Sequence, residues 1–507
     1  MEIYSSLSSF ENHFCTENKP KSFGIVIFGA SGDLTRRKLI PSIYSLYEKN
    51  LLPKPFYILG IGRTVMDDDS FRESVKLHEN IPFYDEHLIK EFLKDVFYLS
   101  GSYEHDGFYS EINDRLKSLE KQRNIDSSRI YYMATPPDVY CKILYYSSKN
   151  KLIEKDSSSE KLKTSRVIVE KPFGHDLDSA MKLDEMISNN LEESQIYRID
   201  HYLGKETVQN ILMFRFANSI FEPVWNRDYV ESVWISADEM NGVGKRAGYF
   251  DKAGQLRDMF QNHMMQLLSL IAMEPPSSFN SELIRDEKVK LLKAIRSFKG
   301  DIANRIVRGR YLQNENLRGY LQEDGVDPES KAETFVAGKF YIDNLRWADV
   351  PFYLRSGKRM GKKETKIVIK FKPVPHSIFH FKDDTVMPGN VLVFNVQPEE
   401  GIELKFQAKH PGSKLCMSSI NMDFNYKKIF GENPPEAYER LILDVMSGDQ
   451  TLFIRHDDMK AAWNLFDPIL KKWKEYGTEN FYGYSAGTDG PEQVDVLLGI
   501  KEAGWNL

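Results

Sequence analysis

The chain has 507 residues, of which 41% are hydrophobic and 28% are charged, which indicates an ordinary folded protein rather than a disordered or fibrous one. A single hydrophobic core rarely grows beyond about 250–300 residues, so more than one domain is expected. The net charge of −6 leaves no large basic surface for nucleic acid, and no run approaches the roughly 20 apolar residues that span a bilayer. We therefore expect neither a nucleic-acid partner nor a membrane.

The cysteines and the N-terminus add two further expectations. Cys15, Cys141 and Cys416 lie far apart, without the spacing of a disulfide framework or a metal site. We therefore predict no metal and a reducing compartment, the cytoplasm. Residues 1–20 are polar and show no periodicity, which predicts a flexible leader outside the first core element.

Residues 21–200 alternate short apolar runs with helical patterns, which is typical of βαβ units. The runs are 23–28, 56–61, 96–99, 130–133 and 166–169. Between the first two, apolar residues at 40, 43, 44 and 47 fall on one helix face, and Pro41 marks the first turns of that helix or a kink. We predict an N-terminal Rossmann-like dinucleotide-binding domain over residues 21–200.

After residue 200 the strand-like runs follow one another directly, at 230–237, 334–342, 366–371, 391–396 and 402–408. They are half apolar and half charged by alternation, which indicates an antiparallel sheet with one solvated face. Helical patterns at 258–273, 436–446 and 457–476 are expected to cover the other face. The predicted fold class is therefore α/β plus α+β. Residues 201–507 are predicted to form a substrate-binding and oligomerisation domain around a large, mainly antiparallel sheet covered by helices on one face.

A glycine-rich turn joins the first strand to the first helix. Its residues are Gly29, Ala30, Ser31, Gly32, Asp33 and Leu34. Glycines permit a tight turn, and the amides at a helix start can meet the charge of a pyrophosphate. We therefore predict that these six residues bind a dinucleotide. The alternative is a plain strand-to-helix turn with Ser31 or Asp33 as the helix cap.

The end of the second strand indicates which dinucleotide is bound. NAD-binding domains usually place an acid there to hold the ribose 2′-hydroxyl. Here Gly62 is followed by Arg63, whose guanidinium suits a 2′-phosphate, so NADP is predicted as the cofactor. The alternative is a solvated surface arginine.

Lys171 follows the strand at 166–169, at the carboxyl end of a presumed parallel strand, where open α/β sheets bind ligands. We predict that it lines the junction between nicotinamide and substrate, the alternative being a solvated lysine. A cis bond before Pro172 is left open.

The densest polar cluster of the chain is the segment RIDHYLGKE at 198–206. If Ile199 points into a core, Asp200 faces the opposite way and can line a cleft together with His201 and Lys205. A sugar phosphate needs cationic and neutral donors together, and the segment supplies them.

The helical pattern at 258–273 carries an apolar stripe that includes Phe260. At about 100° per residue, His263 lies roughly 60° from Phe260, at the edge of the stripe, and is expected to be half sheltered. A structural histidine is the alternative to a catalytic one. Asp258 lies at the helix start, where the dipole favours an acid.

Several motifs, in this order, resemble those of the glucose-6-phosphate dehydrogenase family. They are GASGDLT at 29–35, EKPFG at 170–174, RIDHYLGKE at 198–206, RDMFQNH at 257–263 and VPFYLRSGK at 350–358. Segments at 435–445, 448–453 and 484–491 are similar to that family's C-terminal motifs, so the resemblance covers residues 23–505. The segment at 242–248 departs from the family's pattern, and a second, structural NADP site cannot be matched.

The resemblance implies oxidation of glucose 6-phosphate to 6-phosphogluconolactone with NADP, in the oxidative pentose phosphate pathway. It implies that His263 is the general base, that Asp200 is its carboxylate partner, and that no metal takes part. The substrate contacts it implies are His201, Tyr202 and Lys205 for the phosphate, and Glu239, Asp258, Lys358 and Lys363 for the sugar hydroxyls. Lys171 would contact both substrate and cofactor.

Two other functions remain open at this point. A Gfo/Idh/MocA-type sugar dehydrogenase also pairs a Rossmann domain with a Glu-Lys-Pro string and an antiparallel sheet, but it lacks the phosphate-binding histidine motif. A non-catalytic NADP-sensing protein would have little reason to hold Asp200, His263, Lys205 and Lys358 together. Under any of these functions, the C-terminal sheet is a plausible surface for a homodimer or homotetramer.

Overall fold

The computed structural model describes residues 20–75, 77, 85–126, 128–156, 165–298, 300–376, 378–379, 387–412, 416–431, 435–500 and 505. Residues 1–19 of the predicted leader, with Cys15, lie outside the described residues. Within the described ranges, no helix has the length and apolar character needed to cross a membrane. The chain forms two compact units: Met1–Lys171 with Glu185–Ile199 and Tyr438–Phe453, and Pro172–Asp184 with Asp200–Ala437 and Ile454–Leu507.

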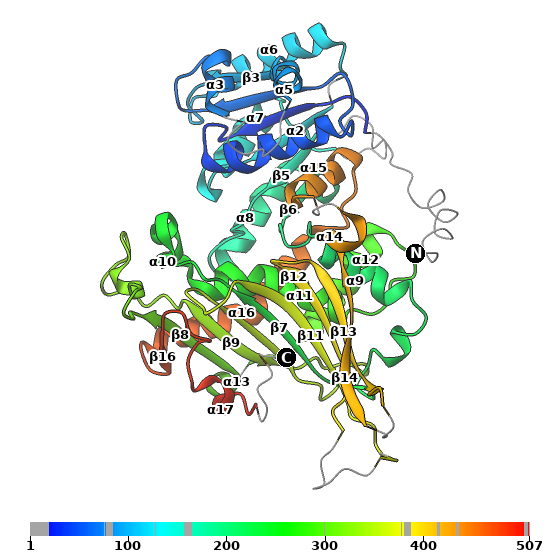
Figure 1. Ribbon diagram of the computed structural model, residues 1–507. Helices are drawn as coiled ribbons and strands as arrows, with labels where there is room; N and C mark the ends of the chain where they lie inside the picture. Colours follow the sequence, from blue (N-terminus) through cyan, green and yellow to red (C-terminus); the bar gives the residue numbers. More distant parts are fainter. Residues whose placement is uncertain are drawn as a thin grey trace. The chain divides into compact units, whose positions relative to one another are not determined.

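The first unit contains a seven-stranded sheet in the order β15-β6-β5-β4-β1-β2-β3 (Figure 1). The strands are β1 (Gly24–Phe28), β2 (Tyr57–Gly62), β3 (Val96–Ser100), β4 (Arg129–Met133), β5 (Arg166–Val169), β6 (Ile196–Ile199) and β15 (Phe453–Ile454). The pairs among strands β1 to β6 are all parallel. Their order in the sheet is that of a doubly wound dinucleotide-binding domain. The predicted Rossmann-like sheet is confirmed.

Helices connect these strands, as the βαβ rhythm predicted. They are α2 (Ile40–Glu48), α3 (Asp68–Val75), α5 (Glu86–Leu93), α6 (Asp106–Arg123), α7 (Pro137–Lys149) and α8 (Leu177–Asn190). Pro41 lies in the first turn of α2, and the preceding π-helical segment η2 (Thr35–Leu39) continues directly into that helix. Every residue of β1 and β2 is buried, which explains their unbroken apolar runs.

A late part of the chain also belongs to the first unit. The Arg166 guanidinium donates hydrogen bonds of 2.7 Å to the carbonyl oxygens of Val445 and Met446, at the end of helix α15 (Ala437–Ser447). The Gln450 amide donates to the backbone of Glu193 and of β6. The prediction that the helix at 436–446 covers the second sheet is therefore wrong. An apolar stripe shows that a helix face is covered, but it does not show by which sheet.

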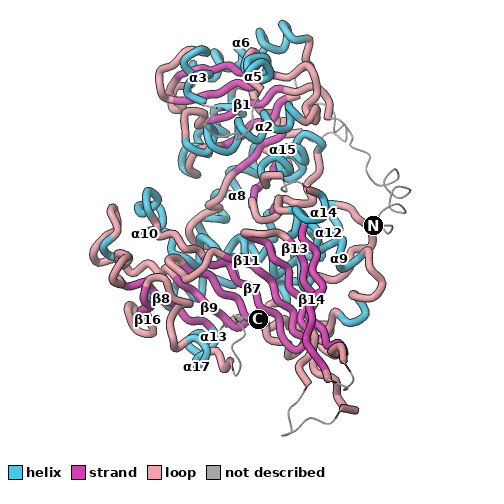
Figure 2. Tube along the Cα trace, in the orientation of Figure 1, coloured by secondary structure: helices cyan, strands magenta, loops and turns pink. Residues whose placement is uncertain are grey.

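The second unit is built on a nine-stranded sheet in the order β14-β13-β12-β11-β7-β10-β9-β8-β16 (Figures 1 and 2). Its strands are β7 (Val230–Asp238), β8 (Ile306–Leu312), β9 (Phe335–Phe340), β10 (Phe352–Gly357), β11 (Glu364–Phe371), β12 (Val391–Gln397), β13 (Gly401–Lys409), β14 (Met417–Asn425) and β16 (Phe481–Ser485). Pairs β7–β10 and β8–β16 are parallel and the other pairs are antiparallel. The predicted mainly antiparallel sheet is confirmed.

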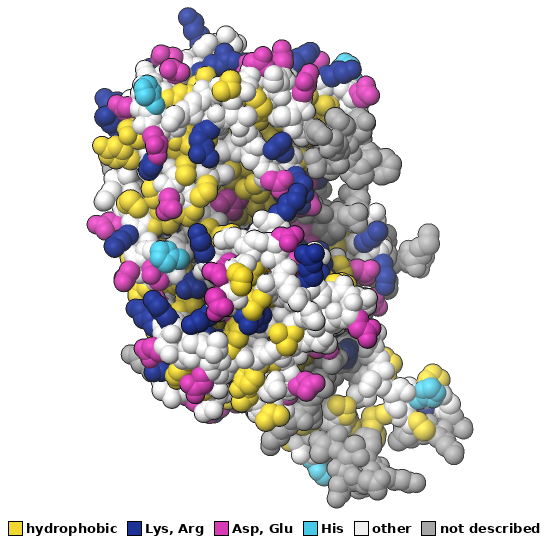
Figure 3. Space-filling view, turned by 90° about the vertical axis from the view of Figure 1, so that its left-hand side faces the viewer, with side chains coloured by type: hydrophobic (Ala, Val, Ile, Leu, Met, Phe, Trp, Pro, Cys, Tyr) yellow, Lys and Arg dark blue, Asp and Glu magenta, His cyan; other side chains and the backbone are white. Residues whose placement is uncertain are grey.

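Helices gather on one face of this sheet (Figure 1). They are α9 (Glu206–Phe216), the π-helical η6 (Leu256–Met264) that continues as α11 (Met265–Ala272), α12 (Ser281–Ala294) and α16 (His456–Tyr476). The other face is not wholly solvated, because Trp234, Tyr353 and Trp505 pack there within a second buried cluster. On the surface drawn in Figure 3, basic and acidic side chains are interspersed.

Candidate active site

The turn after β6 fixes a buried carboxylate. Asp200 is 1% exposed, and its Oδ1 accepts a hydrogen bond of 2.9 Å from the backbone amide of Tyr202. Its carbonyl oxygen accepts a further bond of 3.1 Å from the amide of Leu203. A short acidic side chain that bonds to the backbone two residues on is typical of a tight turn. The carboxylate is therefore oriented by its own turn.

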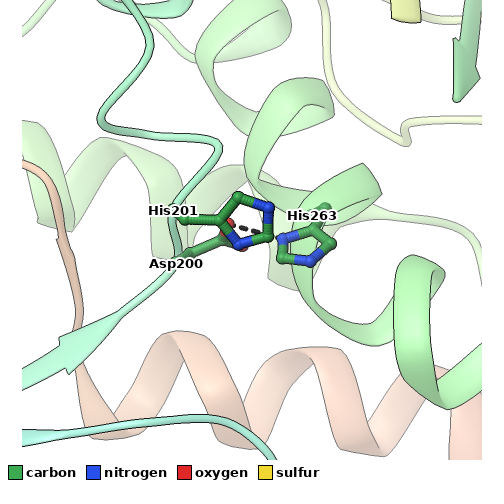
Figure 4. Close-up of side chains that lie close together, drawn as sticks. All are labelled: Asp200, His201 and His263. Atoms are coloured by element: carbon green, nitrogen blue, oxygen red, sulfur yellow. Dashed lines mark hydrogen bonds and ion pairs between the residues drawn. The ribbon is translucent and has the colours of Figure 1, made fainter. Parts of the chain in front are cut away.

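The same oxygen faces the ring of His263. The distance from His263 Nδ1 to Asp200 Oδ1 is 2.5 Å, and both side chains are 1% exposed (Figure 4). The ring stacks on Tyr202 with a centroid distance of 4.4 Å, and His201 lies edge-on at 4.7 Å. Asp200, Tyr202 and His201 thus fix the ring from three directions, although 63 residues separate Asp200 from His263 in the chain.

The expectation that His263 is only half sheltered is wrong. It lies in the π-helical segment η6, which is buried nearly all round, so a position at the edge of one apolar stripe does not show that a residue is exposed. Helix α16 and strand β10 contact η6, and eight of its nine residues are buried. The base predicted from the resemblance is therefore enclosed in the core of the second unit.

A buried glutamate defines where this helical segment begins. The Glu333 carboxylate accepts a hydrogen bond of 3.0 Å from the amide of Leu256, and burial raises the pKa of Glu333. Just before, Gly254 has a φ of 71°, and a Cβ there would lie 2.5 Å from Glu333 Oε1. The Gln255 amide donates 2.7 Å to Ser356 Oγ on β10. These contacts position the start of the element that carries Asp258 and His263.

Three of the residues assigned to the sugar hydroxyls lie together. Lys358 follows β10 and forms an ion pair with Glu239, which follows the parallel neighbour β7. Its Nζ lies 3.9 Å from Asp258 Oδ2. Arg246 Nη2, which the sequence analysis did not single out, lies 3.8 Å from Asp258 Oδ1. Lys363 is exposed just before β11, and among the described residues it forms no ion pair with Glu239 or Asp258.

The phosphate-binding candidates lie in one turn next to His263. Lys205 is the N-cap of α9 and is half-buried, as is His201. Burial raises the pKa of Tyr202 well above its usual value, so its hydroxyl stays protonated as a donor. A Cβ on Gly204 would lie 2.6 Å from the carbonyl oxygen of Ala437, so the turn requires glycine.

Nδ1 of His263 and Oδ1 of Asp200 bond to each other. The absence of a metal at this site stays a prediction.

The first unit contains a cavity of about 500 Å³ at the carboxyl ends of its strands. It is lined by Gly29, Ser31, Gly32, Arg63, Thr64, Tyr103, Ala134, Thr135, Pro136 and Val139. These residues follow strands β1 to β4, and the strand order reverses between β1 and β4, where doubly wound sheets bind nucleotides. A mixed lining of glycines, hydroxyls and one guanidinium fits a dinucleotide phosphate.

Gly29 makes this cavity possible. Its φ is 87°, and a Cβ there would lie 2.4 Å from the carbonyl oxygen of Ala134. Its amide donates to the Tyr103 hydroxyl at 3.0 Å, and burial raises the pKa of Tyr103 to about 12. The alternative prediction, a plain turn with Ser31 or Asp33 as the helix cap, is wrong. Asp33 forms an ion pair of 2.7 Å with Arg37, and no side chain caps η2.

Four of the seven loop residues predicted to bind the cofactor line the cavity: Gly29, Ser31, Gly32 and Arg63. Ala30 is buried against Gly60, Asp33 is exposed, and Leu34 begins the helix. The lining residues that follow β3 and β4 were not predicted, although ligands bind at the carboxyl ends of parallel strands and the runs at 96–99 and 130–133 mark two of those ends.

Lys171 ends the first unit one residue after Glu170. The Glu170 carboxylate accepts hydrogen bonds from the hydroxyls of Tyr132, at 2.5 Å, and Tyr438, at 3.2 Å. The bond before Pro172 is not among the cis bonds of the described residues, which precede Pro55 and Pro398. The ligand contacts of Lys171 stay a prediction.

Comparison with known proteins decides the family. Residues 26–210 match the model of the glucose-6-phosphate dehydrogenase NAD binding domain, and residues 212–506 match the model of the C-terminal domain. The chain belongs to the glucose-6-phosphate dehydrogenase family. Both alternatives left open by the sequence, the Gfo/Idh/MocA-type dehydrogenase and the non-catalytic sensor, are therefore wrong.

Relatives in the glucose-6-phosphate dehydrogenase family align over nearly their whole length. The glucose-6-phosphate 1-dehydrogenase of Chlamydia pneumoniae is 42% identical and covers 95% of both chains, and that of Bacillus subtilis is 41% identical and covers 97% of this chain and 100% of its own. A solved glucose-6-phosphate dehydrogenase in complex with glucose 6-phosphate is 36% identical, with a TM-score of 0.87 over 95% of this chain and 97% of that one. The Mycobacterium avium enzyme is 30% identical, with a TM-score of 0.80 over 95% and 98%. The chain is an oxidoreductase with glucose-6-phosphate 1-dehydrogenase activity.

Proposed function

We propose that this protein oxidises C1 of glucose 6-phosphate with NADP as the hydride acceptor, and that His263 is the general base. The observation that carries the proposal is the buried bond of 2.5 Å between His263 Nδ1 and Asp200 Oδ1, next to the segment assigned to the substrate phosphate. An imidazole held in this way presents its other nitrogen to a ligand.

The proposed reaction moves one proton and one hydride. His263 Nε2 takes the proton of the C1 hydroxyl, and the C1–H electron pair leaves as hydride while the C1–O double bond of 6-phosphogluconolactone forms. NADP, when bound, supplies the acceptor for that hydride. Asp200 holds the proton of His263 on Nδ1 before the reaction and stabilises the imidazolium afterwards, as a buried acid does in a hydrolase triad.

The remaining side chains bind the substrate in this proposal. His201, Tyr202 and Lys205 would hold the phosphate, because they offer cationic and neutral donors in one turn. Glu239, Asp258 and Lys358 would hold sugar hydroxyls, and their mutual ion pairs keep them in place before the sugar arrives. Lys171 and the exposed Lys363 are assigned to the substrate by the resemblance.

A direct assay tests the proposed reaction. Purified protein, glucose 6-phosphate and NADP should generate reduced cofactor, which is followed by its absorbance. A well-folded preparation that reduces NAD but never NADP would contradict the choice of cofactor. Reduction of NADP with glucose but not with glucose 6-phosphate would contradict the phosphate site.

Arg63 tests the choice of NADP separately. Its guanidinium lines the cavity after β2, where a 2′-phosphate would lie. We expect Arg63→Ala to lower kcat/KM with NADP by about 10- to 100-fold, because a charge-assisted bidentate contact is lost, and to change kcat/KM with NAD by less than about threefold. Arg37→Ala, which removes an exposed arginine paired with Asp33, is the matched control. Equal losses with both cofactors would refute the assignment.

We also propose that the protein forms a homodimer or homotetramer through the second sheet. Strand β14 lies at one edge of that sheet and leaves Ile420 and Met422 41% and 60% exposed. Exposed apolar edge strands are usually covered by another chain. Light scattering should give a multiple of the 58.8 kDa chain mass, and Met422→Lys should lower the assembled fraction while Val496→Lys, elsewhere on the same unit, should not. A monomer at micromolar concentration would refute the proposal.

The cytoplasm is the proposed compartment. Cys141 is half-buried and Cys416 is exposed, and both are free thiols. Free thiols of this kind are usual in reducing compartments.

A further inference from the structure

A further buried ion pair joins two helices, α12 and α16, that carry none of the residues assigned to the reaction. Lys288 of α12 and Asp458 of α16 are 0% and 2% exposed, and Lys288 Nζ lies 3.5 Å from Asp458 Oδ2. Lysine is almost never this deeply buried unless it is paired, and a buried pair is a costly way to join two helices. Helix packing alone therefore does not explain why Lys288 and Asp458 are buried.

The pair is connected to the helix that carries His263. The Gln266 amide donates a hydrogen bond of 3.0 Å to Asp458 Oδ1, and Gln266 follows His263 by three residues on the continuous helix η6–α11. Gln266 is itself 1% exposed. Asp458 therefore contacts this helix at a point three residues along the chain from His263.

The charge of Lys288 also acts on Asp200. Burial lowers the pKa of Lys288, and two carboxylates oppose that effect: Asp458 first, then Asp200. Burial raises the pKa of Asp458, which Lys288 and Gln266 oppose. Lys288 is thus a cation shared by one carboxylate of the ion pair and one carboxylate of the active site.

A count of charges indicates what this cation does. Asp200 and Asp458 contribute two negative charges and Lys288 one positive charge, so the buried group is at −1 while His263 is neutral and at zero once His263 has taken a proton. Without Lys288 the group would be at −2, and the site would bind a proton before the substrate arrives. A protonated His263 cannot act as a base.

We propose that Lys288 is a positioning residue for the catalytic pair: its buried charge holds Asp200 ionised and keeps His263 free of a proton until the C1 hydroxyl supplies one. This inference rests on the proposed function, since it needs His263 to be the base. Lys288 does not touch the reacting atoms, and it acts through Asp200.

Other charged groups face this cluster and have to be considered in any pH experiment. On α12, Arg285 opposes the protonation of Lys288, and its own charge is paired with Glu282. On α16, Asp457 precedes Asp458 and pairs with Arg455 at 2.8 Å. On the substrate side, His201 and Tyr202 flank His263, and Asp258 is paired with Lys358 and Arg246. None of these groups is altered in the variants below.

The test compares two variants of the full-length protein. In Lys288→Met with Asp458→Asn, both members of the ion pair are neutral and no unpaired charge is buried. In Asp458→Asn alone, the pair is equally broken but the lysine charge remains. The measurement is kcat/KM for glucose 6-phosphate against pH, with NADP saturating, since the acid limb reports the proton that must leave the free enzyme.

By the charge count, the double variant leaves the buried group at −1, as in the wild type, whereas Asp458→Asn alone leaves it at zero. We therefore expect the acid limb to move to lower pH in Asp458→Asn and to stay near its wild-type position in the double variant. The two limbs should differ by about one unit, which is a tenfold difference in kcat/KM below the limb. On the plateau above it, kcat/KM should stay near the wild-type value. Acid limbs at the same pH in both variants would overturn the inference. Lys288→Gln with Asp458→Asn repeats the test with a second side chain if the methionine variant unfolds early.

One further variant distinguishes a failure of this inference from a failure of the proposed function. If the residual activity of His263→Asn retains the wild-type acid limb, His263 is not the base and the proposed function fails. If that limb disappears in His263→Asn but lies at the same pH in the double variant and in Asp458→Asn, the proposed function stands and the role of Lys288 is refuted. The substrate phosphate ionises in the same way with every variant, so it does not account for a difference between their acid limbs.

Discussion

Replacing His263 by Asn should lower kcat by about 10²- to 10⁴-fold and change KM for glucose 6-phosphate by less than about threefold. The proton acceptor is lost, and general-base catalysis typically contributes a factor of this size. The phosphate contacts assigned to His201, Tyr202 and Lys205 are untouched. The Asn side chain can still donate a hydrogen bond to Asp200, so the buried carboxylate keeps a partner.

Steady-state kinetics with NADP checks this expectation, together with a thermal unfolding curve to show that the variant is folded. Loss of the ring also removes the stack on Tyr202. For that reason, some loss of stability is expected, and it is independent of the kinetic result. A near-normal kcat with a strongly raised KM would mean that His263 binds substrate rather than accepting its proton.

Replacing Asp200 by Asn should also lower kcat by about 10²- to 10⁴-fold. The amide oxygen of the new side chain can still accept the bond from the Tyr202 amide, so the turn after β6 is kept. Its NH₂ group would then face His263 Nδ1, which moves the ring proton to Nε2, the atom that has to accept the substrate proton. The neutral amide also cannot stabilise the imidazolium.

The two substitutions should not add. Because Asp200 acts through His263, the double variant should be no more than about threefold slower than His263→Asn alone, as for groups that function as a unit. Losses that multiply would show that Asp200 contributes to the reaction independently of His263, for example by binding the sugar.

The parallel sheet and the glycine turn could be predicted from the sequence, because their signals are local. The five runs before residue 170 became strands β1 to β5 with small shifts at their ends, and Gly29 has the positive φ that the turn requires. Strand β14 was missed although Ile420, Met422 and Phe424 alternate with polar residues along it. Strands β8, β10 and β16 were also missed.

The candidate site was less accessible to pattern analysis. Asp200 and His263 are 63 residues apart, and only the resemblance to a family brought them together before the structure did. The burial of His263 was underestimated because the apolar stripe was taken as the only buried face, whereas eight of the nine residues of η6 are buried. Lys288 and Asp458 stand in charged stretches that resemble solvated helix faces, so their burial depends on tertiary packing that no local pattern contains.

The hydrogen bonds from Arg166 to the end of α15, and the place of β15 at the edge of the first sheet, have a consequence for how the protein is made. The ribosome releases residues 24–199 long before residues 438–453, so the nucleotide-binding half emerges with one sheet edge still open. That edge is closed only after residues 438–454 have emerged. Premature termination anywhere before residue 438 would therefore leave even the N-terminal half without its last strand and helix, and an isolated N-terminal fragment would lack them too.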